Sequence, residues 1–136
     1  GKIVHGSEMG LMLCTENPCI GASPDGLVRF NYDLYLIEIK CPYKWRKKSL
    51  HDACKEKESC CFLDDNNEIQ LKKNHRYFTQ IQGQMGVCKM QKCDFVLYTV
   101  VDFVIITVQF DSVFWESLLQ KLSEFYVSEI VPKICS

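Results

Sequence analysis

One stretch of this chain constrains the fold more than any other, an apolar run that ends in two charges. Residues 34–40 read L-Y-L-I-E-I-K, so apolar side chains fill both faces of the run before Glu38 and Lys40. Such a run is typical of a central β-strand that is covered on both sides. Because residues i and i+2 of a strand share a face, the Glu38 carboxylate and the Lys40 ammonium are predicted to project side by side. Charges at the end of a buried strand are costly unless they meet partners, which indicates a polar site.

A turn with an acidic residue precedes this strand. Pro24 fixes its own φ and Gly26 permits a tight bend, so the Asp25 carboxylate between them is predicted to be held in place. Taken singly, Asp25 is a turn residue, and Glu38 and Lys40 are a surface ion pair at a sheet edge. Taken together, the three side chains are candidate partners of one another and of a bound cation.

The clearest helix is expected over residues 75–90. On a helical wheel one narrow stripe is apolar, which predicts a helix packed on the sheet. The stripe consists of Phe78, Ile81, Met85 and Cys88, and its flank carries Tyr77, Gln80 and Gln84. The flank is therefore expected to lean over the charged end of the strand.

The remaining patterns predict an α/β (α+β) domain with a central mixed sheet. Strands are expected over residues 20–22, 27–30, 60–63, 68–71, 94–101 and 103–110, with an edge strand within 3–13. Residues 43–57 are expected to be partly helical. Asp111 is a natural N-cap for a long amphipathic helix from Ser112 to about Val131. Its apolar side chains are expected to cover the core: Trp115, Leu118, Leu119, Leu122 and Phe125.

Length and charge narrow the possibilities further. The 136 residues fit one domain, 1–136, and 47% apolar residues with 24% charged residues is a globular balance. The net charge of −1 gives no overall basic field, so attraction to phosphate would have to come from local clusters. Two clusters flank the candidate site: Lys44, Arg46, Lys47 and Lys48, and then Lys72, Lys73, His75 and Arg76.

The compartment is expected to be intracellular, with nucleus and cytoplasm both open. The first residues lack the pattern of a signal peptide, and the most apolar run, residues 95–110, is too short for a membrane span. The nine cysteines show no C-x2-C spacing and are therefore predicted to be mostly reduced thiols of a soluble protein. A metal site built from Cys14, Cys19, Cys60 and Cys61 remains the alternative.

Three blocks in order, G-A-S-P-D-G-L-V, I-E-I-K-C-P-Y and Y-F-T-Q-I-Q-G-Q-M, resemble the YqaJ-like viral recombinases and lambda exonuclease. These form a branch of the PD-(D/E)XK nuclease superfamily. The resemblance implies a restriction-endonuclease-like core, a mixed sheet flanked by helices. It also implies an upstream helix with a further acidic residue. Glu8 matches that residue poorly, so the domain is expected to be N-terminally incomplete relative to the family.

The same resemblance implies the roles of individual residues. Asp25, Glu38 and the backbone carbonyl of Ile39 would hold Mg²⁺ or Mn²⁺, the oxygen-preferring cations. Lys40 would orient or help to deprotonate the attacking water, and Gln80 would lie near the metal and the substrate. The residues expected to contact DNA are Ser23, Tyr43, Lys44, Arg46, Lys47, Lys72, Lys73, Arg76, Tyr77, Gln82 and Gln84.

The function that the resemblance implies is a metal-dependent deoxyribonuclease, a 5′-3′ exonuclease acting on duplex DNA ends in recombination or repair. One alternative is an endonuclease of the same superfamily. Another is a catalytically silent module that binds DNA or a protein, which the poor match to the upstream acid favours. Assembly into a homo-oligomer and binding to a single-strand annealing protein are both left open, and no membrane association is expected.

Overall fold

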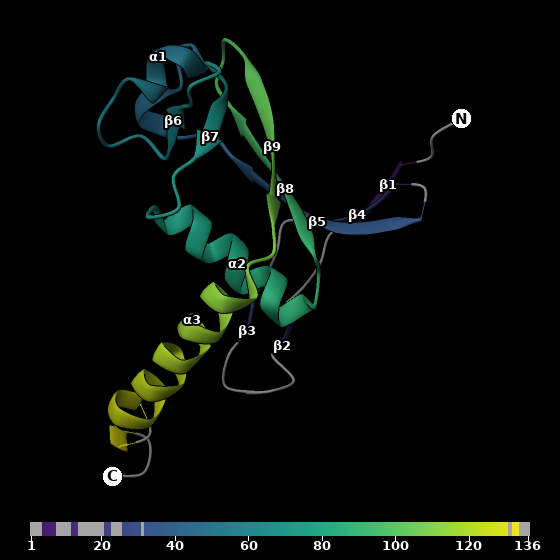
Figure 1. Ribbon diagram of the computed structural model, residues 1–136, viewed down its shortest axis with the longest axis vertical. Helices are drawn as coiled ribbons and strands as arrows, with labels where there is room; N and C mark the ends of the chain where they lie inside the picture. The colour runs from purple at the N-terminus through teal and green to yellow at the C-terminus, as the bar shows by residue number, and fades with distance from the viewer. Residues whose placement is uncertain are drawn as a thin grey trace.

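A five-stranded mixed sheet forms the centre of the computed structural model, which describes residues 4–7, 12–13, 21–22, 26–30, 32–130 and 132–133 (Figure 1). In spatial order its strands are β1 (Val4–Ser7), β4 (Gly26–Phe30), β5 (Asp33–Lys40), β8 (Lys92–Tyr98) and β9 (Phe103–Gln109). β5 pairs in parallel with β8, and the other neighbours are antiparallel. The run ending in Glu38 and Lys40 is thus the central strand, as predicted.

Two short hairpins lie outside this sheet. They are formed by β2 (Met12–Leu13) with β3 (Gly21–Ala22) and by β6 (Cys61–Leu63) with β7 (Ile69–Leu71). The expected strand at 20–22 therefore exists, but it pairs with β2. The expected edge strand within 3–13 is two strands, of which only β1 joins the central sheet, by pairing with β4.

The helices begin where the sequence places them. They are the 3-10 turn Tyr43–Trp45, α1 (Leu50–Cys54), α2 (Arg76–Cys88), α3 (Ser112–Phe125) and a π-helical turn Tyr126–Ile130. His75 caps α2, and Asp111 caps α3 by accepting a hydrogen bond from Phe114 N at 3.0 Å. No helix within the described ranges is long and apolar enough to cross a membrane.

The β8–β9 turn is tied to the chain that follows β5. The Asp102 carboxylate accepts a hydrogen bond from Leu50 N at 3.0 Å, at the start of α1, and another from the Thr99 hydroxyl. Val100 N donates to the carbonyl oxygen of Arg46 at 2.8 Å. Residues 46–50 are therefore held against the end of the sheet.

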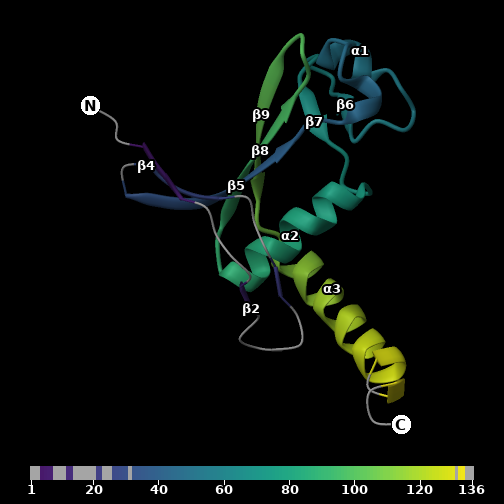
Figure 2. The same ribbon diagram turned by 180° about the vertical axis from the view of Figure 1, so that it is seen from behind.

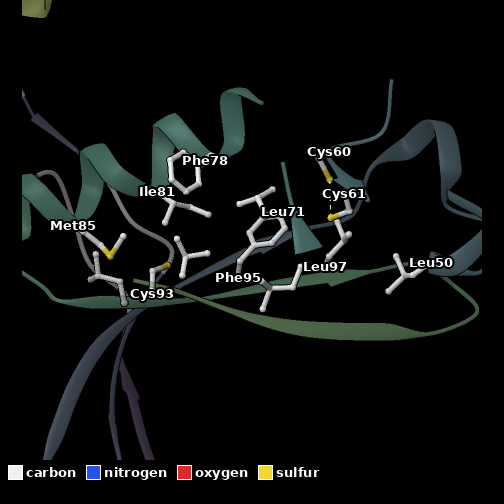
Figure 3. Packing of buried hydrophobic residues seen from close by; sticks show 13 residues of the cluster. Leu50, Cys60, Cys61, Leu71, Phe78, Ile81, Met85, Cys93, Phe95 and Leu97 are labelled. Atoms are coloured by element: carbon white, nitrogen blue, oxygen red, sulfur yellow. Dashed lines mark hydrogen bonds between the residues drawn. The ribbon is translucent and has the colours of Figure 1, made fainter. Parts of the chain in front are cut away.

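The core lies between the sheet and one layer made of α2 and the β6–β7 hairpin (Figure 3). Ile81 and Met85 of α2 point toward Phe95 and Cys93 of β8, and these side chains are fully buried. Apolar residues three to four apart on α2 thus meet apolar residues two apart on the strands, as the periodicities require.

The opposite face of the sheet corrects one expectation. The run at residues 34–40 was predicted to be covered on both faces, yet Ile39 is 45% exposed and Tyr35 and Ile37 are only half-buried. The described layer of α2, β6 and β7 lies on the side of Leu36 and Glu38. An apolar run therefore marked a central strand correctly but overstated its burial.

α3 differs from its expected role as a cover for the core. Of its predicted stripe only Trp115 is buried, while Leu122 and Phe125 are exposed, Phe125 at 55%. The helix packs on α2 through its first turns and then extends away from the sheet (Figures 1 and 2). Its α-helical part ends at Phe125, and the π-helical turn continues to Ile130, close to the expected boundary near Val131.

The α2–α3 contact depends on a glycine, which leads to a stability prediction. A Cβ on Gly86 would overlap the Trp115 ring, whereas one on Gly83 would lie 3.7 Å from Leu118 Cδ2, an ordinary contact. We expect Gly86→Ala to lower the unfolding free energy by about 1–3 kcal/mol through overpacking. Gly83→Ala, the matched control, should raise it by up to about 1 kcal/mol because alanine favours the helix. Chemical denaturation of both variants measures this. Equal stabilities would contradict the close packing.

Candidate active site

The C-terminal end of β5 brings two charged side chains together. Glu38 is 2% exposed, and its Oε1 lies 3.8 Å from Nζ of Lys40, which is 27% exposed. Leu36, Glu38 and Lys40 share the face that packs under α2, as their spacing predicts. A buried carboxylate next to a cationic side chain can bind a metal ion or stabilise a transition state.

The first turn of α2 forms a wall over this pair. The Tyr77 ring centroid lies 5.3 Å from Lys40 Nζ and 5.9 Å from the ring centroid of Phe95. Phe95 is the partner of Glu38 in the β5–β8 register. His75 orients this turn, since its Nδ1 accepts a hydrogen bond from Tyr77 N at 3.1 Å. The cap of α2 therefore positions an aromatic ring against the catalytic lysine candidate.

The glutamines of α2 occupy different environments. Gln80 is exposed, one turn beyond Tyr77. Gln84 is 4% exposed, and within the described part of the chain its Oε1 accepts no hydrogen bond. Because Gln84 follows Tyr77 by two turns of helix, both lie on the same flank of α2. Gln80 and Gln84 thus remain candidates for the site, with only Gln80 open to solvent.

Gln82 corrects the expectation that it contacts DNA. It is fully buried, its Nε2 donates to the carbonyl oxygen of Gln109 at 2.9 Å, and its Oε1 accepts from Asp111 N at 2.8 Å. The amide nitrogen and the amide oxygen of Gln82 both bind the junction of β9 and α3. The error arose because a glutamine on a polar-looking helix is indistinguishable in sequence from a surface residue.

The first basic cluster is less cationic than its sequence suggests. Lys44 pairs with Glu58 at 2.7 Å and Lys48 with Glu56 at 2.6 Å, both at the surface. The hydrogen bond and charge of Lys44 lower the pKa of the Glu58 carboxyl, so this pair is ionised at neutral pH. Lys47 is exposed and lies on the same segment. The sequence did not reveal these pairings because the acids follow the lysines by eight to fourteen residues.

The second basic cluster is divided by the structure. Arg76, with His75, lines a pocket that it shares with Tyr77. Lys73 instead lines two grooves beside β7, together with Gln70. Lys72 Nζ donates to the carbonyl oxygen of Lys57 at 3.0 Å. Arg76 therefore lies near Tyr77, the ring that is also near Lys40, while the structure does not bring Lys73 to that pocket.

Arg46 is also engaged within the chain. Its guanidinium stacks 3.6 Å from the centroid of the Tyr43 ring, and its Nη1 donates to the Tyr43 carbonyl oxygen at 2.7 Å. The stack is a cation–π contact of a kind that orders an exposed ring. Tyr43 and Arg46 thus form one ordered unit next to the end of β5.

Two expected site residues, Asp25 and Ser23, lie outside the described residues. Among those described, no group of three or more histidine, cysteine or acidic side chains could hold a metal ion. The alternative cysteine site involves Cys14 and Cys19, which also lie outside; Cys60 and Cys61 are buried, with their Sγ atoms 3.6 Å apart. The buried oxygens of Glu38 suit a hard cation, and Ile39, whose carbonyl was expected to join them, follows directly.

A mixed sheet with a buried glutamate and a nearby lysine at the end of its central strand, crossed by a helix, is the arrangement expected of the PD-(D/E)XK nuclease fold. Residues 3–91 match the model of the YqaJ-like viral recombinase domain. The chain belongs to this family, as its sequence blocks indicated. No curated protein matches the chain.

Solved structures agree with this assignment. The chain is similar to the alkaline exonuclease LHK-Exo from Laribacter hongkongensis, with 30% identity and a TM-score of 0.67 over 93% of this chain. A second structure, LHK-Exo in complex with dAMP, matches with the same identity and TM-score. The chain spans only 56% and 57% of these two exonuclease chains.

The cap of α2 leads to a pH prediction. Burial, and then the charges of Arg76 and Lys72, lower the pKa of His75, so the folded state favours the neutral ring that accepts from Tyr77 N. The unfolded chain takes up the proton first as the pH falls. The stabilisation is therefore complete above about pH 6.5, the ordinary pKa of histidine, and is lost as the pH falls from that value through the lower pKa of the folded state.

Unfolding free energies measured from pH 8 to pH 5 test this. The wild type should lose stability below about pH 6.5, and His75→Asn, which keeps a capping acceptor that does not titrate, should lose less. His51→Asn changes an exposed histidine of α1 and is the matched control. A pH profile of His75→Asn that parallels the wild type would rule out a neutral cap.

Proposed function

We propose that this chain is the catalytic part of a metal-dependent exonuclease that removes nucleotides from the ends of duplex DNA. The Glu38–Lys40 pair at the end of β5 is the observation that carries the proposal. The similarity to an alkaline exonuclease supports exonuclease rather than endonuclease activity, and intact Glu38 and Lys40 argue against a silent module. A 5′-3′ polarity follows only from the sequence resemblance.

The backbone register supports Asp25 as the second carboxylate. Gly26, the first residue of β4, pairs with Ile37, the residue before Glu38. Asp25 is bonded to Gly26 and is therefore one peptide bond from this paired position, next to the residue that precedes Glu38 on the facing strand. We therefore assign Asp25, Glu38 and the Ile39 carbonyl as the ligands of Mg²⁺ or Mn²⁺.

A bound divalent cation would supply Lewis-acid stabilisation of the charge that develops on the scissile phosphate. Lys40 would act beside it, because its ammonium lies 3.8 Å from the carboxylate of Glu38 and 5.3 Å from the centroid of the Tyr77 ring, yet remains partly exposed. From there it orients the attacking water and offsets negative charge in the transition state. Gln80, exposed on the flank of α2, positions the substrate. A deoxynucleoside 5′-monophosphate is the expected product.

The catalytic pair is tested by substitution. We expect Glu38→Gln and Lys40→Ala each to lower the rate of duplex DNA degradation by about 100-fold or more, since each removes an electrostatic or proton-transfer group. Gln80→Ala should reduce the rate less. Asp33→Asn and Lys92→Ala are matched controls, because this pair lies 3.6 Å apart at the opposite end of the same strands, with Lys92 over the Tyr35 ring.

Controls should retain the wild-type rate, and thermal melts should show that every variant is folded. Full activity of folded Glu38→Gln would overturn the assignment of the site.

Metal dependence and end specificity are tested with the same protein. Linear duplex DNA should be degraded with Mg²⁺ and left intact with a chelator, and closed circular duplex should stay intact in both cases. Nicking of circles would identify an endonuclease. Binding of DNA without cleavage of either substrate, with Mg²⁺ or Mn²⁺ present, would identify a silent module.

A further inference from the structure

A small pocket is lined by Tyr77, the ring that lies near Lys40 of the Glu38–Lys40 pair. It has a volume of about 250 Å³ and lies between the residues that follow β5 and the start of α2. Its walls combine the rings of Tyr43, Trp45, Tyr77 and His75 with the charged side chains of Lys44, Glu58 and Arg76. Tyr77 connects the pocket to the catalytic pair, because it lines the pocket and its ring centroid is 5.3 Å from Lys40 Nζ. The pocket thus begins one side chain away from the proposed point of hydrolysis.

We propose that this pocket binds the nucleobase of the nucleotide whose phosphate lies at Lys40. The inference rests on the proposed function and adds a subsite to it. A pocket of this volume is smaller than those that enclose drug-sized ligands, so it suits a single flipped or unpaired base rather than a duplex. A base must leave the helix stack to enter it.

The walls suit a flat aromatic ligand. Aromatic side chains stack on any base, since every base has a π-face, and an enzyme that removes successive nucleotides needs such tolerance. Tyr43 is held for this role by the Arg46 guanidinium, which stacks on its ring at 3.6 Å and donates to its carbonyl oxygen. Rings that are ordered before binding lose less entropy on contact with a ligand.

The polar groups favour a base over a second phosphate. The charge of Lys44 is offset by Glu58, which also lines the pocket, at 2.7 Å. His75 uses Nδ1 to accept from Tyr77 N, so its neutral ring carries a hydrogen on Nε2, a donor that matches the ring nitrogens and carbonyl oxygens of bases. Arg76, exposed beside them, is left as the contact to a neighbouring phosphate.

Equilibrium binding of two probes tests the subsite. dAMP and 2-deoxyribose 5-phosphate share the sugar and phosphate but differ in the base, and calorimetry with Mg²⁺ compares their affinities. Stacking contributes about 1–3 kcal/mol per base, so dAMP should bind about 5- to 150-fold more tightly. Tyr43→Leu and Trp45→Leu should each reduce this ratio several-fold while leaving the affinity for 2-deoxyribose 5-phosphate unchanged.

Tyr32→Leu is the matched control, because Tyr32 is a fully exposed tyrosine at the other end of β5 and should keep the wild-type ratio. Equal affinities of the two probes, or a wild-type ratio in folded Tyr43→Leu and Trp45→Leu, would overturn the subsite. The hydrolytic function fails separately. If dAMP binds more tightly but Glu38→Gln keeps full activity, the base subsite is supported and the catalytic assignment is wrong. If the two probes bind equally but Glu38→Gln is inactive, the catalytic assignment is supported and the base subsite is wrong.

Discussion

The structure depends on placing one carboxylate out of water at the end of its central strand. Glu38 is nearly fully buried, and a buried charge costs several kcal/mol unless a counter-charge and hydrogen bonds offset that cost. Lys40 provides the counter-charge from the same strand, two residues on, so no other element has to be docked before the two charges meet. The sheet, the α2 layer and the Tyr77 ring then enclose this pair. Under the proposed function this costly group is kept because it serves the chemistry, in keeping with the clustering of buried charged groups at functional sites.

Much of the fold was predictable because its signals are local. The spacing of Phe78, Ile81 and Met85 predicted α2, and Asp111 marked the start of α3. The apolar run before Glu38 predicted the central strand. What could not be predicted depends on contacts distant in sequence. Residues 20–22 read as a strand, but their pairing with β2 rather than with the sheet follows from tertiary position, and the exposure of Phe125 follows from the direction in which α3 leaves the sheet.

The site divides in the same way. The side-by-side placement of Glu38 and Lys40 follows from the two-residue period of a strand, so spacing alone sufficed. Gln82 could not be assigned correctly, since its partners are the backbone of Gln109 and Asp111, nearly thirty residues away. The pairing of Lys44 with Glu58 was equally hidden. The family blocks supplied the candidates for chemistry, while only the three-dimensional structure showed which polar residues serve the scaffold.

The hydrogen bonds of the β8–β9 turn have a consequence for the site. Hydrogen bonds join Arg46 to Val100 and Leu50 to Asp102. They connect the segment that carries Tyr43 and Trp45 to the sheet that carries Glu38. A segment fastened in this way is held in place relative to the sheet. Under the proposed function a ligand would meet rings that are already positioned, which favours docking into a preformed surface over loop closure.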